Sequence, residues 1–105
     1  MNEIEGNALG DQEVLLSALA RFAQTHPALP GGYISTSSFT PTEAHVLLDT
    51  ASALEAWREA LHVDTTEVAR SALNQRTRLE FVTRLGRSTV VIYAVFSLAT
   101  EGAAV

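Results

Sequence analysis

The sequence contains no cysteine and no lysine, and its longest apolar run, Val90 to Phe96, is short. Without cysteine the chain can form neither a disulfide framework nor a thiolate metal site, and it has no cysteine nucleophile. The apolar run is far shorter than the roughly 20 residues of a membrane-spanning helix. The first residues also lack the basic start and apolar stretch of a signal peptide. We therefore expect a soluble, cytoplasmic protein that does not associate with membranes.

The length of 105 residues fits one small domain with a single hydrophobic core. Residues 1–10 mix acidic residues, asparagine and glycine without periodicity, so we expect a flexible N-terminus. Residues 99–105 are mostly small and show no pattern, and we expect them to form a C-terminal tail. The sequence thus predicts one folded domain over residues 11–98.

Charge is distributed unevenly along the chain, which has a net charge of −5. Residues 1–67 contain ten acidic side chains and two arginines, whereas residues 68–105 contain five arginines and two glutamates. Such asymmetry can steer association of the chain with itself or with an acidic partner, or it can match charges between two layers of one fold. An acidic chain with one aromatic residue in its arginine-rich strand is a poor candidate for nucleic-acid binding.

The C-terminal stretch from Leu79 to Leu98 predicts a β-hairpin around which the fold is built. Two β-rich runs flank Gly86-Arg87, and glycine at the first position of a two-residue turn is typical of a type II′ hairpin. Paired residues share a face of the sheet. The expected pairs are Leu85 with Ser88, Thr83 with Val90, Phe81 with Ile92, and Leu79 with Ala94.

The second strand of this hairpin is apolar on both of its faces. Val91, Tyr93 and Val95 lie opposite the expected core face, although a sheet face in water is normally polar. One interpretation is that this strand is central and covered on both faces by the chain's own helices or termini. The other is that the strip contacts a partner, because large apolar patches on small proteins usually mark contacts.

Two helices are predicted in the first two thirds of the chain. The first begins with Asp11 as its N-terminal cap and ends before Pro27, because the residue before a proline is pushed out of the helical region. Its apolar stripe consists of Val14, Leu15, Ala18, Leu19 and Phe22. The second begins with a capping box formed by Ser52 and Glu55. It has Ala53, Leu54, Trp57, Ala60 and Leu61 on its buried side, with Glu55 and Glu59 flanking Arg58 on the solvent side.

Three further strands are expected. Residues 33–39 and 43–49 are predicted to form two of them, joined by a turn at residues 40–42. Residues 64–74 fit either a short helix or a strand, and we favour a strand over residues 68–73. A three-residue loop at 74–76 would then pair Leu73 with Thr77 and Ser71 with Leu79, which puts Arg70 on the same face as the arginines of the next strand.

The resulting order of elements is αββαβββ. Antiparallel hairpins with both helices stacked on one face form a two-layer α+β sandwich. We therefore expect an antiparallel sheet of four to five strands covered on one face by two helices.

The sequence contains no recognisable catalytic, metal or cofactor motif. The spacing of His26, His45 and His62 matches no metal site, and we expect His26 and His62 to be structural residues at helix ends. His45 and Asp49 share a strand face, but their Cα atoms lie about 13 Å apart and could act together only across a substrate. No serine elbow or glycine-rich phosphate loop is present. The sequence therefore favours a non-catalytic role without a cofactor.

Two hypotheses for function follow. The first is a small interaction or regulatory domain that forms a homodimer, or docks a protein partner, through the outer face of its sheet. The residues expected at this interface are Leu47, Val82, Val91, Tyr93 and Val95, with Arg78 and Arg84 at the rim. The second is a small enzyme or ligand-binding domain with a pocket on the same face, whose polar groups would be His45, Asp49 and Tyr93.

Overall fold

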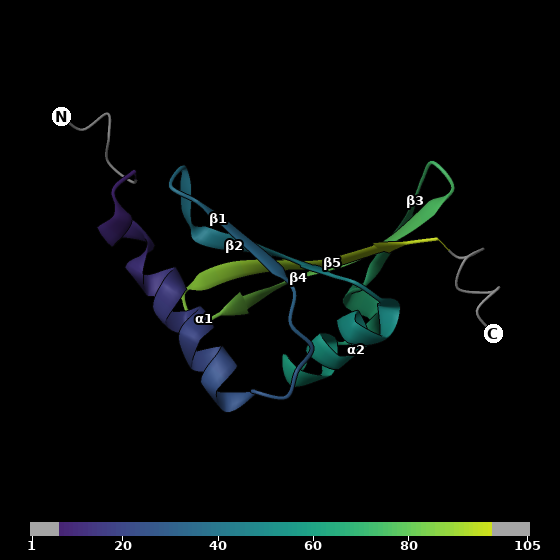
Figure 1. The fold of residues 1–105 in the computed structure, drawn as a ribbon, viewed down its shortest axis with the longest axis horizontal. Helices are drawn as coiled ribbons and strands as arrows, with labels where there is room; N and C mark the ends of the chain where they lie inside the picture. Colours follow the sequence, from purple (N-terminus) through teal and green to yellow (C-terminus); the bar gives the residue numbers. More distant parts are fainter. Residues whose placement is uncertain (1–6, 98–105) are drawn as a thin grey trace.

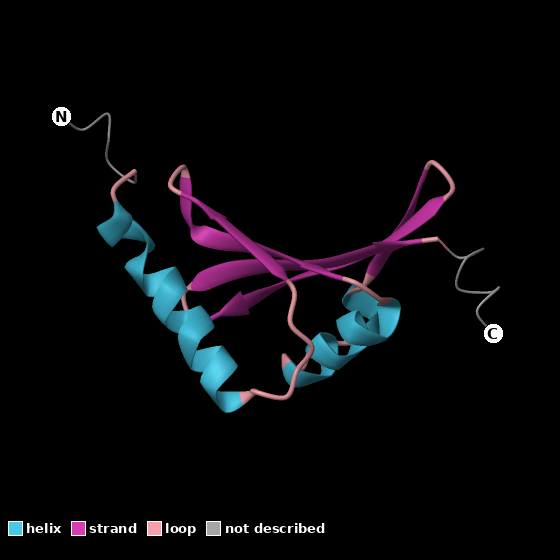
Figure 2. Ribbon diagram, in the orientation of Figure 1, coloured by secondary structure: helices cyan, strands magenta, loops and turns pink. Residues whose placement is uncertain are grey.

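The computed structural model describes residues 7–97, which form a five-stranded sheet with two helices on one face (Figures 1 and 2). The helices are α1 (Glu13–Thr25) and α2 (Ala51–Ala60), and the short 3-10 helices are η2 (Leu9–Gln12) and η3 (Thr65–Glu67). The strands are β1 (Tyr33–Ser37), β2 (Thr40–Leu48), β3 (Ala69–Leu73), β4 (Arg76–Leu85) and β5 (Ser88–Phe96). The predicted two-layer α+β architecture and its αββαβββ order are confirmed. Of the expected flexible N-terminus at residues 1–10, residues 1–6 lie outside the described residues, as do Leu98 and the tail at 99–105, whereas Leu9 and Gly10 belong to η2.

The sheet is mixed and mostly antiparallel, whereas a wholly antiparallel sheet was expected, and its strand order is β1-β2-β5-β4-β3. Pairing is antiparallel in three of the four neighbouring pairs and parallel between β2 and β5, where Val46 lies opposite Ile92. A parallel pair needs a long connection between its strands, and α2, β3 and β4 provide it here. The most apolar strand, β5, therefore occupies the centre of the sheet.

The β4–β5 hairpin has the predicted register and turn. The four pairs from Leu85–Ser88 to Leu79–Ala94 are all present. Gly86 has a φ of +65°, while Arg87 is not in the positive-φ region, and this combination fits a type II′ turn. The turn chemistry and the alternation of apolar residues agree at this hairpin, which is why a local pattern was sufficient to predict it.

The predicted strand at residues 68–73 is confirmed, but its predicted register is wrong by one residue. The turn consists of Asn74 and Gln75 alone, with φ values of 49° and 62°, and Ser71 pairs with Arg78 instead of Leu79. Both turn residues thus adopt the left-handed conformation that a type I′ turn requires. Since β3 is an exposed edge strand, burial does not select its register. As a result Arg70 pairs with Leu79, on the face that the helices cover, and not beside the other arginines.

The β1–β2 hairpin turns earlier than predicted. Its turn lies at Ser38 and Phe39, and the expected turn residues 40–42 are the first part of β2. The register shifts between Thr36 and Ser37, which accommodates the additional β2 residues around Pro41. The expected strand over 43–49 is otherwise present, but it ends at Leu48, so Asp49 lies just beyond it.

The predicted stripe of α2 is buried or half-buried, but in α1 Val14 is 44% exposed and was wrongly assigned to the buried stripe, and the caps at both helix starts differ. Asp11 belongs to η2, where its carboxylate accepts a hydrogen bond from the Ala8 N–H at 3.2 Å, and Gln12 is the capping position of α1. In α2 the cap is Thr50, whose Oγ1 accepts a hydrogen bond from the Ala53 N–H at 3.0 Å, and Ser52 lies inside the first turn. Several neighbouring polar residues can cap a helix, and docking of the helix on the sheet decides which one does.

The end of α2 is closed by a Schellman motif centred on His62. This residue has a φ of 58°, its N–H donates to the Glu59 carbonyl, and the Val63 N–H donates to the Arg58 carbonyl, both at 3.1 Å. Arg58 was predicted on the solvent side, yet its side chain is only 12% exposed and donates hydrogen bonds to Glu55 and to the Val63 carbonyl. The Arg58 hydrogen bond lowers the pKa of Glu55 below its usual value. The backbone of His62 thus ends α2, at the helix end where the sequence placed this residue.

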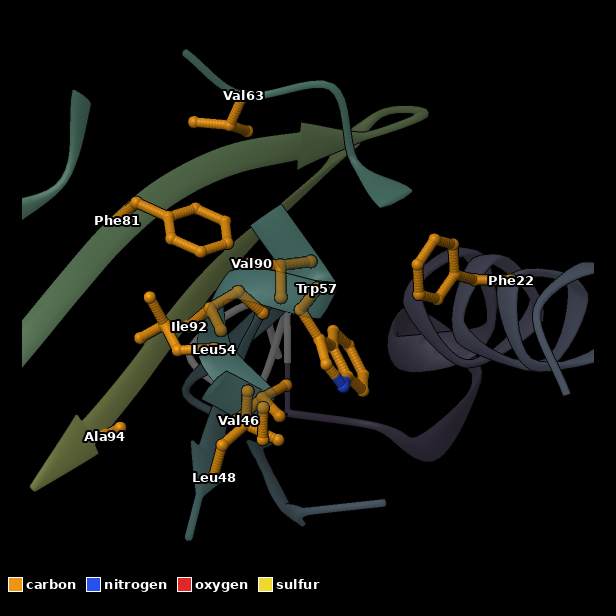
Figure 3. Close-up of a cluster of buried hydrophobic side chains, with 11 residues drawn as sticks. Phe22, Val46, Leu48, Leu54, Trp57, Val63, Phe81, Val90, Ile92 and Ala94 are labelled. Atoms are coloured by element: carbon orange, nitrogen blue, oxygen red, sulfur yellow. The ribbon is translucent and has the colours of Figure 1, made fainter. Parts of the chain in front are cut away.

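The hydrophobic core lies between the sheet and the two helices (Figure 3). Phe81 and Ile92 reach it from the centre of the sheet, Leu54 and Trp57 from α2, and Phe22 from α1. The Phe22 and Trp57 rings are 5.4 Å apart, so they join the two helices as well as covering the sheet. Burial of each such side chain contributes about 1.5–3 kcal/mol, and this layer therefore holds the fold together.

Candidate functional site

The candidate site is the outer face of the sheet, meaning the face opposite α1 and α2. None of the described elements lies over this face in Figures 1 and 2. All seven predicted interface residues belong to it by strand alternation and register. All five strands contribute side chains to it: Tyr33, Ser35, Glu43, His45, Leu47, Ala69, Ser71, Arg76, Arg78, Glu80, Val82, Arg84, Thr89, Val91, Tyr93 and Val95.

Register arranges the apolar residues of the outer face in adjacent rows. Leu47 lies opposite Tyr93 across the parallel β2–β5 pair, and Val82 lies opposite Val91 across the β4–β5 hairpin. Val95 lies next to Arg78 in the following row. The five predicted apolar residues thus form one patch over three strands, which we call the outer patch.

Exposure varies widely within the outer patch. Val82 is 52% exposed, whereas Val91, which lies between His45 and Val82 of the neighbouring strands, is only 8% exposed. Leu47, Tyr93 and Val95 are half-buried. Of the two interpretations of the apolar strip, the central position of β5 is confirmed, but the helices cover only its other face. Val82 is therefore the most exposed side chain of the outer patch.

The two arginines predicted at the rim are placed differently. The Arg78 guanidinium lies 4.3 Å from the centre of the Tyr93 ring, and its Nη2 is 2.7 Å from Glu80 Oε1. This cation–π contact and ion pair hold Arg78 flat over the aromatic ring. Arg84 is exposed, and its Nη2 donates a hydrogen bond to the Arg87 carbonyl at 3.3 Å. Arg78 is thus part of the patch itself, while Arg84 remains a rim residue.

The predicted pocket groups His45, Asp49 and Tyr93 do not form a cluster. His45 Nε2 lies 2.7 Å from Glu43 Oε2, so its partner is the residue two positions earlier, not Asp49. Asp49 is exposed beyond the end of β2, and Tyr93 lies under Arg78. Three surface hollows that the structure contains all border α1 and not the outer face.

Two acidic residues of the site were not identified from the sequence. Glu43 pairs with His45, and Glu80 pairs with Arg78, each two positions away along one strand. Residues at i and i+2 of a strand share a face, so this spacing was the signal that could have revealed both pairs. The outer face is therefore less basic than the arginine count of β4 suggests.

Other binding chemistries find little support in residues 7–97. No group of three or more histidine, aspartate or glutamate side chains in this range is placed to hold a metal ion. No helix in the described part of the chain is long and apolar enough to cross a membrane. His26 stacks on Phe22 with ring centres 4.5 Å apart, and its Nδ1 lies 2.9 Å from Thr25 Oγ1. This contact fits the structural role at a helix end that its sequence position suggested.

Comparisons with known proteins add no family to this description. No protein-family model, no curated protein and no solved structure matches the chain.

Proposed function

We propose that the chain is a small non-catalytic interaction domain that associates with a second copy of itself through the outer patch. The observation that carries this proposal is the register of β2, β5 and β4, which joins Leu47, Tyr93, Val91 and Val82 into one apolar surface on a face that no described element covers. Two such faces would pack as a sheet-on-sheet interface, with side chains of both copies interleaved.

The charges around the outer patch support a second copy as its occupant. The face carries both acidic and basic side chains. Glu43 and Glu80 are acidic, and Arg78 and Arg84 are basic. A two-fold interface brings each group near the same surface of its mate, so a patch of mixed sign can match itself. The intramolecular pairs at His45 and Arg78 also lower the cost of removing these charges from water.

The test uses Val82, because it is the exposed member of the outer patch. Replacing it with aspartate places a charge in the proposed contact in both copies, and an unpaired buried charge costs several kcal/mol. The matched control is Val14→Asp on α1, where valine is 44% exposed against 52% at Val82. Val91 is less suitable because it is 8% exposed, and aspartate there would disturb the monomer itself.

The measurement is molar mass in solution across a wide concentration range, with circular dichroism to verify folding. We expect wild type and Val14→Asp at the dimer mass and folded Val82→Asp at the monomer mass. A wild type that is monomeric throughout, or a Val82→Asp variant that stays dimeric, would overturn the proposal.

A further inference from the structure

A second surface, along α1 and the helix-facing side of β1, also exposes apolar side chains. Among the described residues the exposed large apolar side chains are Leu9, Val14, Leu16, Tyr33, Ile34, Phe39 and Val82. Val82 lies on the outer face, and so does Tyr33, because it pairs with Leu47. Leu16 and Ile34 are 43% and 47% exposed although they belong to the helix-covered side of the molecule. We call the surface formed by η2, the adjoining side of α1 and the free edge of β1 the α1–β1 flank.

The backbone edge of β1 is open. It is the first strand in the sheet order and pairs only with β2, and residues 33–36 are all exposed. Edge strands are usually protected by charged side chains or proline, and Tyr33–Ser37 contains neither. The opposite edge strand, β3, carries Arg70. The register shift at Thr36–Ser37 lies at the end of β1 and leaves its first residues regular.

A groove runs between α1 and the helix-side surface of β1. Gln12 Nε2 donates a weak hydrogen bond to Thr36 Oγ1 at 3.4 Å, which places the start of α1 beside the end of β1. Leu19, in the second half of α1, lines a hollow together with Ile34 at the start of β1. The helix and the strand are therefore antiparallel, and Leu16, which is 43% exposed, lies between Gln12 and Leu19 along α1.

One end of this groove is an apolar hollow of about 240 Å³. Leu19, Ala23, His26, Leu29, Ile34 and Trp57 contribute to its lining. It opens beside the first residues of β1, so a side chain from a strand added to that edge would reach it. The hollow fits an apolar side chain, because most of its lining is aliphatic or aromatic.

Near the other end of the groove, η2 and the start of α1 carry acidic side chains. Glu13 lies in a shallow depression with Leu9, Leu16 and Ala20, and Asp11 is exposed one turn earlier. The ion pairs between described residues include neither of these carboxylates. A ligand that lies along β1 would therefore meet an apolar site at one end and negative charge at the other.

We propose that the α1–β1 flank binds an extended segment of a partner protein as an additional strand on β1. Main-chain hydrogen bonds to the free edge would hold the segment, alternate apolar side chains would enter the groove, and a basic side chain would reach Glu13. The five residues of β1 span about 16 Å, so a short segment is sufficient. This site is separate from the outer patch, and it does not depend on the proposed dimer.

A second copy of this chain fits the flank less well. In an antiparallel pairing of two β1 strands, the incoming strand would offer only the residues of Tyr33–Ser37, none of which is basic. The net charge of −5 on each copy would also oppose the approach of two acidic surfaces. Charge complementarity therefore favours a basic, apolar-alternating partner segment.

The probe is the capped synthetic peptide Arg-Ser-Val-Ser-Leu-Ser-Arg, in which either orientation brings one arginine to the acidic end. Two control peptides accompany it. One has glutamate in place of both arginines, and the other is N-methylated at two successive central residues, so that an amide facing β1 is lost whichever way the strand lies. Binding is measured with the fluorescence of Trp57, the only tryptophan, and with amide exchange at residues 33–37.

We expect the arginine peptide to change Trp57 emission and to slow exchange of the β1 amides, and both controls to bind more weakly. Glu13→Gln should weaken binding of the arginine peptide by roughly two- to fivefold, the size of a surface ion pair. Glu13→Arg should reverse the preference, so that the glutamate peptide binds more tightly than the arginine peptide. Glu67→Gln, an exposed site in η3, is the matched control and should leave both affinities unchanged.

Three outcomes would overturn this inference. The first is no response of Trp57 or of the β1 amides to the arginine peptide at millimolar concentration. The second is equal binding of the N-methylated peptide, which would exclude strand addition. The third is protection of the β1 amides without peptide that rises with protein concentration, because a second copy would then occupy the edge. The Val82→Asp variant should bind the peptide as tightly as wild type. Peptide binding therefore tests the α1–β1 flank independently of the proposed dimer.

Discussion

The indole N–H of Trp57 donates a hydrogen bond to the carbonyl of Pro30 at 2.8 Å. This bond connects the centre of α2 with the linker that leads from α1 to β1. Trp57 is otherwise buried against the core, with its ring close to Phe22. One side chain therefore joins three segments: both helices and the loop that borders the apolar hollow.

Trp57→Phe should destabilise the protein by about 1–2 kcal/mol, because the aromatic packing is mostly retained while the Pro30 carbonyl loses its donor. Trp57→Ala should cost about 3–5 kcal/mol, since it also removes the large ring from the core. Urea unfolding followed by circular dichroism measures both values. Equal stability of Trp57→Phe and wild type would show that the hydrogen bond contributes nothing.

Gly32 and Gly31 are adjacent in the linker but should respond differently to alanine. A Cβ at Gly32 would lie 2.8 Å from the Leu47 carbonyl oxygen and 2.8 Å from Leu48 Cδ2, whereas a Cβ at Gly31 would meet no atom within 4 Å. Gly32→Ala should therefore lower the free energy of unfolding by about 1–3 kcal/mol, the usual cost of overpacking. Gly31→Ala should change it by less than about 0.5 kcal/mol. A loss at Gly31 equal to that at Gly32 would contradict this account.

The parts of the fold that the sequence predicted are those with a local physical signal. The β4–β5 hairpin is one, because Gly86 allows a positive φ and the flanking apolar residues alternate in step with the turn. The register of β3 was mispredicted, because Asn74 and Gln75 form the turn without glycine and the exposed strand has no buried face to select its pairing. Parallel pairing of β2 with β5 joins distant segments and has no local pattern at all.

The residues of the outer patch were correctly predicted to share one face of the sheet. The prediction was possible because side chains alternate along a strand and the hairpin register determines which residues pair. Val82, Val91 and Tyr93 follow directly from the register at Gly86. The α1–β1 flank was missed, because Leu16 and Ile34 were given no role from the sequence and the exposed Val14 was placed in the buried stripe of the helix. Their exposure depends on how α1 docks beside β1, which is a property of the assembled layers.

Gly86→Val tests the conformational demand of the turn. A Cβ there would meet no atom within 4 Å, so any destabilisation comes from the φ of +65°, which a β-branched residue adopts only with strain. We expect a loss of about 1–3 kcal/mol. Gly86→Asn, with a residue that tolerates positive φ, should cost clearly less. Thermal unfolding of the two variants side by side measures the difference, and equal costs would refute the assignment of strain.

Ser88→Ala should leave the protein as stable as before or make it slightly more stable. The Ser88 hydroxyl is fully buried and has no hydrogen-bond partner within residues 7–97. Removing an unsatisfied buried polar group relieves a desolvation cost of about 1–3 kcal/mol, offset by the small void that the missing oxygen leaves. Ser71→Ala on the exposed edge is the control and should be neutral. A marked loss of stability in Ser88→Ala would mean that the hydroxyl is hydrogen-bonded after all.

Asp64 should contribute to the acid sensitivity of the protein. The Thr66 N–H and hydroxyl donate to its carboxylate at 2.9 and 3.0 Å, and these hydrogen bonds lower the pKa of Asp64 in the folded state. At pH values above the pKa of Asp64 in the unfolded chain, its lowered pKa in the folded state stabilises the fold. This contribution is lost as the pH falls through the folded-state pKa of Asp64.

The measurement for Asp64 is the melting temperature between about pH 7 and pH 2, which spans the ordinary titration of aspartate. Asp64→Asn should melt below wild type near neutral pH, and the two curves should converge at the acid end. Asp49→Asn, at an exposed position just after β2, is the control. A difference between wild type and Asp64→Asn that is independent of pH would exclude this contribution.

The parallel pairing of β2 with β5 also determines how the chain can fold. Before β5 is in place, β1–β2 and β3–β4 are two separate hairpins, neither of which has a neighbour on its inner edge. The sheet therefore closes through contacts between residues far apart in sequence, such as Val46 and Ile92, and such high contact order slows folding. A chain cut between α2 and β3 would yield one fragment with β1 and β2 and another with β3, β4 and β5. Mixing them should restore one cooperative unit, since β5 is the strand that both halves need.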